Sequence, residues 1–65
     1  MFTFEAFIDA VMARHKYVGD LVYVRNDREN GRYLAKLPNG VRIIGRPGSR
    51  KVTVRQYSHQ WMTEF

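Results

Sequence analysis

The stretch that decides the fold reads Arg32-Tyr-Leu-Ala-Lys-Leu-Pro-Asn-Gly-Val-Arg-Ile-Ile-Gly-Arg-Pro-Gly-Ser-Arg-Lys-Val-Thr-Val-Arg-Gln-Tyr57. Two proline–glycine interruptions divide it into three runs, which predict antiparallel strands joined by hairpins. Proline sets φ for the first corner of a type I turn, and glycine accepts the left-handed conformation that closes a three-residue loop. Pro38-Asn39-Gly40 therefore places Leu37 opposite Val41, and a four-residue loop at 47–50 sets the second register.

The two turns agree, because both keep apolar residues opposite apolar residues. The predicted pairs are Leu37–Val41, Lys36–Arg42, Ala35–Ile43, Leu34–Ile44, Ile43–Val54, Arg42–Arg55 and Arg46–Lys51. One face is then apolar and predicts the core side: Tyr33, Ala35, Leu37, Val41, Ile43, Val52 and Val54. The other face is basic: Arg32, Lys36, Arg42, Arg46, Lys51 and Arg55.

Lys36, Arg42 and Arg55 form a row across three neighbouring strands of this predicted sheet. Like charges directly opposite each other destabilise a sheet by a few tenths of a kcal/mol per pair. The chain has no Asp or Glu from Asn30 to Thr63, so no acid in this stretch relieves the repulsion. An anionic partner would relieve it, which is the main functional indication in the sequence.

Length and composition limit the classes of protein that need to be considered. Sixty-five residues predict one small domain, 1–65, and the 45% hydrophobic content argues against disorder. Cysteine is absent, which excludes a disulfide-stapled mini-protein and favours the cytoplasm. We expect neither a membrane span nor an export signal, because the chain has no long apolar run and its N-terminus has no basic segment.

The formal net charge of +5 is unevenly distributed. Residues 1–20 carry Arg14 and Lys16 against Glu5, Asp9 and Asp20, a net charge of −1, so the remaining residues carry +6. The positive charge belongs to the predicted sheet. Such a sheet attracts nucleic acid, an anionic membrane surface or an acidic protein, and charge alone does not choose among them.

The N-terminal segment predicts a helix over about 3–17, with Thr3 as N-cap and Phe2 and Phe7 as a hydrophobic staple. The stripe of this helix should cover the apolar face of the sheet: Phe4, Phe7, Ile8, Val11, Met12 and His15. Gly19 is placed to end the segment.

A first strand is expected at about 21–25, followed by an exposed loop at 26–31. Pairing Arg25 with Arg32 would put Tyr23 beside Leu34 and create an apolar row on the basic face: Tyr23, Leu34, Ile44 and Thr53. Two interpretations follow: a terminal segment covers this row, or the row is an exposed platform flanked by bases. The tail 58–65 supplies the cover in the first, as a short helix capped by Ser58, with Trp61 and Phe65 one turn apart.

The predicted fold class is α+β, with an N-terminal helix packed on a four-stranded antiparallel meander and a short C-terminal helix. The predicted strands are about 21–25, 32–37, 41–46 and 51–57. The meander is a candidate for curling into a barrel, because Gly19-Asp-Leu-Val-Tyr-Val24 resembles the opening strand of SH3-like and KOW-type barrels.

We expect no enzyme activity, no cofactor and no metal site. His15 and His59 have no carboxylate at a triad spacing and no cysteine at a zinc-ligand spacing. The order of helix, strands and terminal helix is similar to the HicA family of small messenger-RNA-cleaving toxins. That resemblance implies a ribonuclease, but residues 21–37 lack the early-strand histidine of the family, so His59 or Tyr57 would have to act instead.

Gly45-Arg46-Pro47 resembles the core of the AT-hook, which inserts arginine into a narrow minor groove of DNA. Ile44 stands where that motif carries a second arginine, and the flanks of the core are predicted strands. We therefore interpret 47–51 as a hairpin tip that presents basic side chains.

The function that we favour is non-catalytic binding of DNA or RNA, with phosphates on basic side chains and bases on tyrosine rings. The candidate nucleic-acid-binding residues are Tyr23, Arg25, Arg32, Lys36, Arg42, Arg46, Arg50, Lys51, Arg55 and Tyr57. The alternative is a small protein-binding inhibitor or adaptor of the kind phages encode, which docks on an acidic host protein or nucleic-acid enzyme. An exposed edge strand also leads us to expect that two copies can pair as a homodimer.

Overall fold

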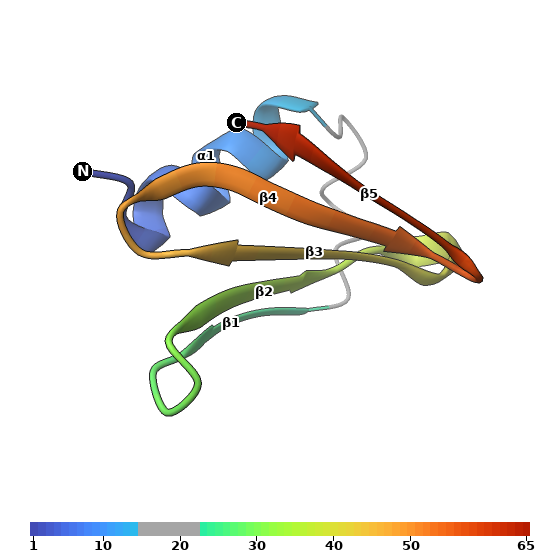
Figure 1. Cartoon of the computed structure of the whole chain (residues 1–65), viewed down its shortest axis with the longest axis horizontal. Helices are drawn as coiled ribbons and strands as arrows, with labels where there is room; N and C mark the ends of the chain where they lie inside the picture. The colour runs from blue at the N-terminus through green and yellow to red at the C-terminus, as the bar shows by residue number, and fades with distance from the viewer. Residues whose placement is uncertain (15–22) are drawn as a thin grey trace.

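The computed structural model describes residues 1–14 and 23–65. Within these ranges one helix precedes five strands, and each strand pairs antiparallel with the next along the chain (Figure 1). The elements are α1 (Phe4–Arg14), β1 (Tyr23–Asp27), β2 (Arg32–Lys36), β3 (Val41–Arg46), β4 (Ser49–Gln56) and β5 (His59–Glu64). The described part of the sheet is open, with β1 and β5 at its two edges.

Helix α1 begins as the sequence predicts. The backbone N–H of Ala6 donates to Thr3 Oγ1 at 3.1 Å, which satisfies one of the free donors of the first turn. The rings of Phe2 and Phe7 meet edge to face with centroids 6.4 Å apart, so the predicted hydrophobic staple is formed. Of the predicted stripe, Phe7 and Val11 are buried and Met12 is half exposed. Residues 15–17 of the predicted helix, His15 among them, and Gly19 lie outside the described ranges.

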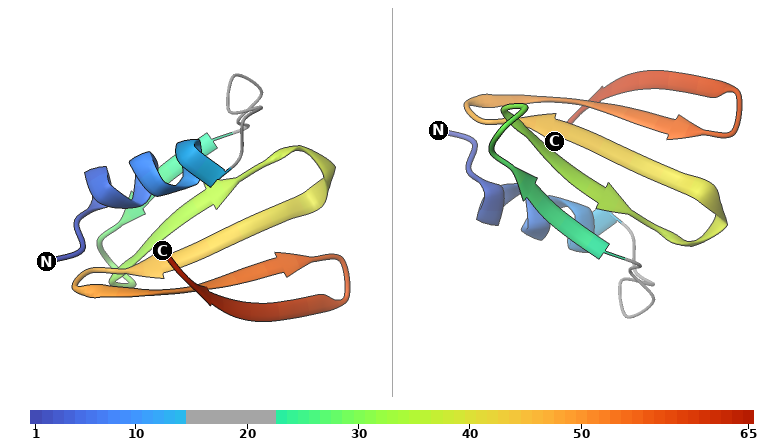
Figure 2. Two further views of the ribbon diagram at one scale, coloured as in Figure 1. Left: turned by 90° about the horizontal axis from the view of Figure 1, so that it is seen from above. Right: turned by 90° about the horizontal axis from the view of Figure 1, so that it is seen from below.

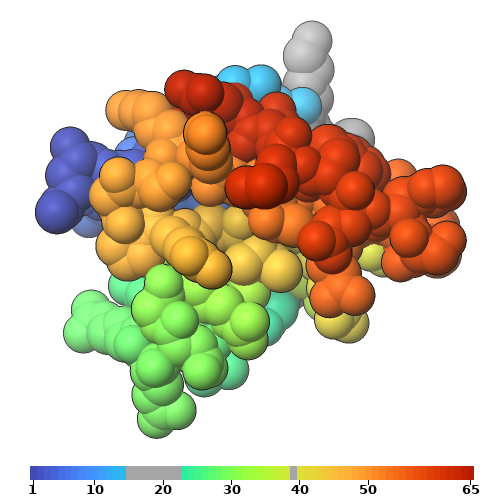
Figure 3. Space-filling model, in the orientation of Figure 1, coloured from blue at the N-terminus to red at the C-terminus, as the bar shows by residue number. Residues whose placement is uncertain are grey.

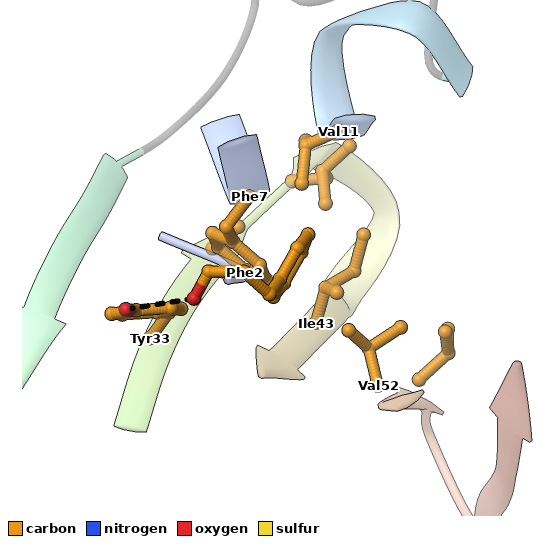
Figure 4. Packing of buried hydrophobic residues seen from close by; sticks show 9 residues of the cluster. Phe2, Phe7, Val11, Tyr33, Ile43 and Val52 are labelled. Atoms are coloured by element: carbon orange, nitrogen blue, oxygen red, sulfur yellow. Dashed lines mark hydrogen bonds between the residues drawn. The ribbon is translucent and has the colours of Figure 1, made fainter. Parts of the chain in front are cut away.

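The helix covers one face of the sheet, and no other described element covers the opposite face (Figure 2). We call the face toward α1 the inner face and the opposite face the outer face. All seven residues predicted for the core side are buried or half buried. The core packs Phe2, Phe7 and Val11 against Tyr33, Ile43 and Val52 (Figure 4).

The turn at Pro38–Gly40 forms as predicted, with Gly40 at φ 72° and the N–H of Leu37 donating to the carbonyl of Val41 at 2.8 Å. The register that it imposes is also confirmed: Leu34–Ile44, Ala35–Ile43 and Lys36–Arg42 are strand partners. The next hairpin confirms Ile43–Val54 and Arg42–Arg55. The pairings at the centre of this three-stranded sheet are thus correctly predicted by the Pro38–Gly40 turn and the apolar pattern.

The predicted Arg46–Lys51 pair is wrong. The second turn has two residues, Pro47 and Gly48, instead of four, and Arg46 pairs with Ser49. Gly48 takes φ 77°, and its N–H donates to the carbonyl of Phe2 at 2.9 Å. A register irregularity between Ile44 and Arg46 absorbs the two-residue difference. The N-terminal segment thereby holds a tighter turn than the four-residue loop predicted for 47–50.

The fold class is corrected in two respects: the sheet has five strands instead of four, and no C-terminal helix is present among the described residues. The tail expected to form a helix is β5, which pairs along the whole of its length with β4. Every second residue of an edge strand exchanges backbone hydrogen bonds with the neighbouring strand, whereas a helix of eight residues is marginal in water. The predicted barrel is not formed by the described strands, which remain an open sheet.

The register of the first hairpin is also corrected. Strand β1 runs to Asp27, and Arg32 pairs with Asp27 instead of Arg25. Tyr23 consequently lies opposite Lys36, and Arg25 lies opposite Leu34. A shift of two residues leaves each side chain on its predicted face, because side chains alternate with a period of two. Residues 21 and 22 of the predicted strand lie outside the described ranges.

Candidate nucleic-acid interface

The outer face is organised in rows that cross the strands. One row has Tyr23, Lys36, Arg42, Arg55 and Gln60 as successive strand partners. The next row, two residues further along each strand, has Arg25, Leu34, Ile44, Thr53 and Met62. Two residues of strand span about 7 Å, so a basic row and a largely apolar row run side by side.

Lys36, Arg42 and Arg55 are the centre of the candidate site, and we call them the basic row. Their adjacency is the predicted one, with Arg42 paired to Lys36 on one side and to Arg55 on the other. Arg42 and Arg55 are exposed, and Lys36 is half buried. The described residues offer none of the three an acidic partner within ion-pair distance. Adjacent strands lie about 4.8 Å apart, so three positive charges share a short span of surface.

A groove opens beside the basic row. It has a volume of about 520 Å³, and its floor includes the half-buried side chains of Leu34 and Ile44. The other lining residues are Tyr23, Arg32, Ala35, Lys36, Arg42 and Arg55. The terminal segment does not cover the apolar row, because it extends the sheet as β5. The structure therefore favours the second interpretation, an apolar platform flanked by bases.

A second hollow of about 370 Å³ adjoins the first and shares the whole basic row with it. Its other lining residues are Gly40 and Tyr57. Tyr57 lies in the turn between β4 and β5, is 79% exposed, and has φ 56°, a left-handed conformation that costs a non-glycine residue free energy. A Cβ atom added at Gly40 would lie 3.6 Å from the Tyr57 ring, so the tyrosine is placed against the Pro38–Gly40 turn.

Arg32 lines the groove, but its charge is already compensated. Its Nε donates to Asp27 Oδ2 at 3.2 Å, and the Asn30 side-chain amide donates to the same oxygen at 2.9 Å. The hydrogen bond from Asn30, followed by that from Arg32, holds the pKa of the Asp27 carboxyl below its ordinary value of 3.8 against the opposing effect of burial. This cluster closes the base of the turn between β1 and β2, which projects from the molecular surface (Figure 3). Arg32 therefore holds a hairpin as well as lining the groove.

The remaining predicted cations of the outer face are spread around the groove. Arg25 is exposed on β1 opposite Leu34, and Arg46 is exposed at the end of β3. Lys51 is exposed on β4, where Glu64 is its strand partner. Because the tail is a strand, it brings one acid onto the outer face, beside Lys51.

Arg50 does not lie on the outer face with the other predicted cations. Its guanidinium carbon lies 5.4 Å from the centroid of the Phe2 ring, and its Nη1 donates to the carbonyl of Phe65 at 3.1 Å. The reason is the two-residue turn: β4 starts at Ser49, and Arg50 shares the alternation of Val52 and Val54, which face the core. The structure thus brings Tyr23, Lys36, Arg42, Arg55 and Tyr57 together and places Arg50 elsewhere.

Leu34, Ile44 and Gly40 line the site but were not among the predicted site residues. The sequence did carry a signal for the first two, since the predicted pairing puts both on the basic face. Gly40 carried none, because its place beside Tyr57 depends on how two turns at the same end of the sheet approach each other.

His59, one of the two residues considered for catalysis, lines neither hollow of the outer face. His59 is exposed at the start of β5, and its strand partner is Gln56. Among residues 1–14 and 23–65, no three His, Asp or Glu residues gather closely enough to hold a metal ion. The terminal helix on which the likeness to HicA toxins depended is a strand, so the order of elements differs from that family.

No helix in the described part of the chain is long and apolar enough to cross a membrane. Comparisons with protein-family models, with curated proteins and with solved structures find no match to this chain.

Proposed function

We propose that this protein binds nucleic acid without catalysis, through the outer face of its sheet. The observation that supports this best is the basic row: Lys36, Arg42 and Arg55 lie side by side across three strands. The row borders a groove with an apolar floor and two partly exposed tyrosines, Tyr23 and Tyr57. Phosphates need the cations, and bases need the apolar and aromatic surface.

The energetics of the row support an anionic ligand. Each like-charged pair across neighbouring strands destabilises the free protein by a few tenths of a kcal/mol. A phosphate between two of these side chains would remove that repulsion and release counterions from the nucleic acid. Repulsion within the basic row therefore slightly destabilises the free protein, and binding of an anion would remove this destabilisation.

Arg42→Glu is the sharpest test, because Arg42 is the middle residue of the row. The variant should weaken nucleic-acid binding at least tenfold, while its free energy of unfolding stays the same or rises by about 0.5 kcal/mol, since Lys36 and Arg55 gain an opposite charge between them. Fluorescence anisotropy with labelled DNA and RNA gives the affinity, and urea unfolding gives the stability.

Arg28→Glu is the matched control. It makes the same change of charge on an exposed residue of the turn between β1 and β2, outside the groove. It should change affinity only slightly, through the net charge. If folded Arg42→Glu binds as the wild type does, or if both variants lose affinity equally, the basic row is not the site.

The second candidate function is that of an inhibitor or adaptor of the kind phages encode, which docks on an acidic protein. The apolar floor of Leu34 and Ile44 between flanking cations supports it, because protein interfaces combine an apolar centre with a polar rim. Salt separates the two candidates. Phosphate binding should weaken roughly tenfold or more over a few-fold rise in salt if several contacts form, whereas a contact centred on apolar residues should weaken much less.

Catalysis is the least favoured reading. We expect RNA to remain intact with the wild-type protein, because His59 and Tyr57 have no partner in the described site that would activate them. RNA cleavage by the wild type that is lost in His59→Ala would reverse this conclusion.

The absence of cysteine fits a reducing compartment, so we place the proposed function in the cytoplasm.

We also propose that two copies pair through β5. The N–H of Phe65 points toward β4, where it donates to the carbonyl of Arg50 at 2.7 Å. By the alternation of an antiparallel ladder, the backbone groups of Gln60, Met62 and Glu64 point to the free edge. The Glu64 carbonyl accepts from Arg14 Nη2, but Gln60 and Met62 have no backbone partner on this side among the described residues, and such an edge is a template for another strand.

A further inference from the structure

The nucleic acid that fits the outer face can be narrowed by the shape and chemistry of the groove. The groove of about 520 Å³ falls within the size of sites that hold small ring-bearing molecules. Its floor of Leu34 and Ile44 has no charged atoms, and Tyr23 stands at the β1 end of the basic row. The floor therefore suits the face of a flat ring better than it suits a phosphate.

The basic row separates this floor from Tyr57, because both hollows share Lys36, Arg42 and Arg55. A chain lying along the row would have aromatic or apolar surface on both sides of its phosphates. Bases splayed from a flexible strand can reach such surfaces, and stacking on aromatic side chains is tolerant of base identity.

A duplex cannot use this arrangement. Its bases are paired and stacked inside a convex cylinder, so only phosphates and groove edges would reach the protein. Contact with a duplex would leave Leu34, Ile44 and both tyrosine rings without partners.

We infer that the outer face binds single-stranded nucleic acid, with phosphates on Lys36, Arg42 and Arg55 and bases against the Leu34–Ile44 floor and the rings of Tyr23 and Tyr57. The inference rests on the proposed nucleic-acid binding and names its substrate class. It selects open strands of DNA or RNA and no particular base sequence.

The test compares three probes of one length at one salt concentration: a labelled single strand, the same strand annealed to its complement, and a single strand whose central nucleotides are abasic. DNA and RNA versions of the first two are measured. The single strand should bind at least tenfold more tightly than the duplex, and the abasic strand should lose about tenfold, because each stacked base contributes appreciably to affinity.

Tyr23→Ala and Tyr57→Ala supply a second readout. Each should lower affinity about fivefold or more without changing the slope of log affinity against log salt, since the number of phosphate contacts is the same. Arg42→Gln should make that slope shallower by about 0.7. Met12→Ala removes a half-exposed apolar side chain from the helix, on the other side of the sheet, and should change neither quantity.

The outcomes separate the two levels of the proposal. Equal, salt-dependent affinity for single strand and duplex would overturn the single-strand inference and leave nucleic-acid binding standing. Full affinity for the abasic strand, or for both folded tyrosine variants, would overturn it as well. No binding of any probe at low salt would overturn the proposed function together with the inference.

Discussion

Gly45 allows the helix to lie directly on the sheet. A Cβ atom at this position would come within 2.9 Å of Phe7 Cδ1 and 3.3 Å of Val52 Cγ1, both in the core. The Phe7 ring also packs against Tyr33 with centroids 5.6 Å apart, so it has little freedom to retreat. A single missing methyl group thus fixes how closely the two layers of the molecule approach.

Gly45→Ala should therefore lower the free energy of unfolding by about 1–3 kcal/mol, as overpacking of a close-packed core does. Urea unfolding measures the loss. The control is the same substitution in a Phe7→Leu background, where the ring is gone and the added methyl group has room. A penalty that is equally large in both backgrounds would show that contact with Phe7 is not its cause.

Asp27 makes the hairpin between β1 and β2 sensitive to acid. Its carboxyl is buried at 4% exposure, and Asn30 and Arg32 hold its pKa below the ordinary value of 3.8. A group whose folded pKa is lowered stabilises the fold above its unfolded pKa and loses that contribution as the pH falls through the folded value. The contribution is thus complete at neutral pH and is lost progressively as the pH falls below about 4.

Asp27→Asn should be less stable than the wild type at neutral pH, because Arg32 loses its ion pair. The variant should also lose less stability than the wild type between pH 5 and pH 2.5, a range that brackets carboxyl titration. Urea midpoints across the range measure both effects. Glu29→Gln, an exposed change in the same turn, should keep the wild-type acid dependence. Parallel acid curves for wild type and Asp27→Asn would contradict the assignment to Asp27.

At the scale of elements, the turn between β4 and β5 is strained in a way that suits a binding surface. Tyr57 holds φ 56° there, although glycine is the residue that adopts this conformation without cost. Strained residues of this kind gather at functional sites, where the observed outlier suggests a use for the side chain.

Tyr57→Gly should raise the free energy of unfolding by up to about 1 kcal/mol, because relief of strain exceeds the added entropy of the unfolded chain. The same variant should bind single-stranded nucleic acid less tightly, since the ring is lost. Urea unfolding and anisotropy on one preparation measure the two effects. Lower stability in Tyr57→Gly would mean that the contact of the ring beside Gly40 outweighs the strain.

The central strands were predictable from the sequence because their turns carry local chemistry. Pro38 and Gly40 dictate one loop conformation, and an apolar pattern with a period of two permits one register around it. That register pairs Lys36 with Arg42, and the apolar pattern, which sets Ile43 opposite Val54, adds Arg55 to the row. This part of the candidate site therefore needed no tertiary information.

The elements at the two sides of the sheet were mispredicted because their signals are ambiguous. Trp61 and Phe65 are four residues apart, a spacing that puts two side chains on one face of a helix and equally on one face of a strand. The tail forms a strand instead of a helix because the edge of β4 offers it backbone partners along its whole length. Arg50 was misplaced because the length of its turn depends on a hydrogen bond from Gly48 to Phe2, which is distant in sequence.

At the scale of the whole molecule, charge is divided between the two layers. Helix α1 carries Glu5, Asp9 and Arg14, a net charge of −1, whereas the basic row lies on the opposite face of the sheet. Such a division orients an approaching anion toward the outer face before contact is made. The helix, which packs against the inner face, and the outer face of the sheet thus carry opposite net charges.

The proposed pairing of two copies has one register that disturbs no existing contact. The carbonyl of Glu64 accepts a hydrogen bond from Arg14 Nη2 at 3.1 Å, so pairing that uses Glu64 would compete with it. Pairing centred on Trp61 uses only Gln60 and Met62 of each copy, through four backbone hydrogen bonds in the geometry of an antiparallel ladder. It also sets Trp61, which is 47% exposed, opposite its counterpart, and aromatic cross-strand pairs are favourable.

Gln60→Pro should abolish this dimer and leave the monomer folded. The N–H that proline lacks is one that points to the free edge, so the ladder with β4 loses no hydrogen bond. Sedimentation equilibrium over a range of concentrations should show a monomer–dimer equilibrium for the wild type and for Gln60→Ala, which keeps the N–H, and only monomer for Gln60→Pro. A wild type that stays monomeric at every concentration would exclude the dimer, whereas a Gln60→Pro variant that still dimerises would move the interface away from β5.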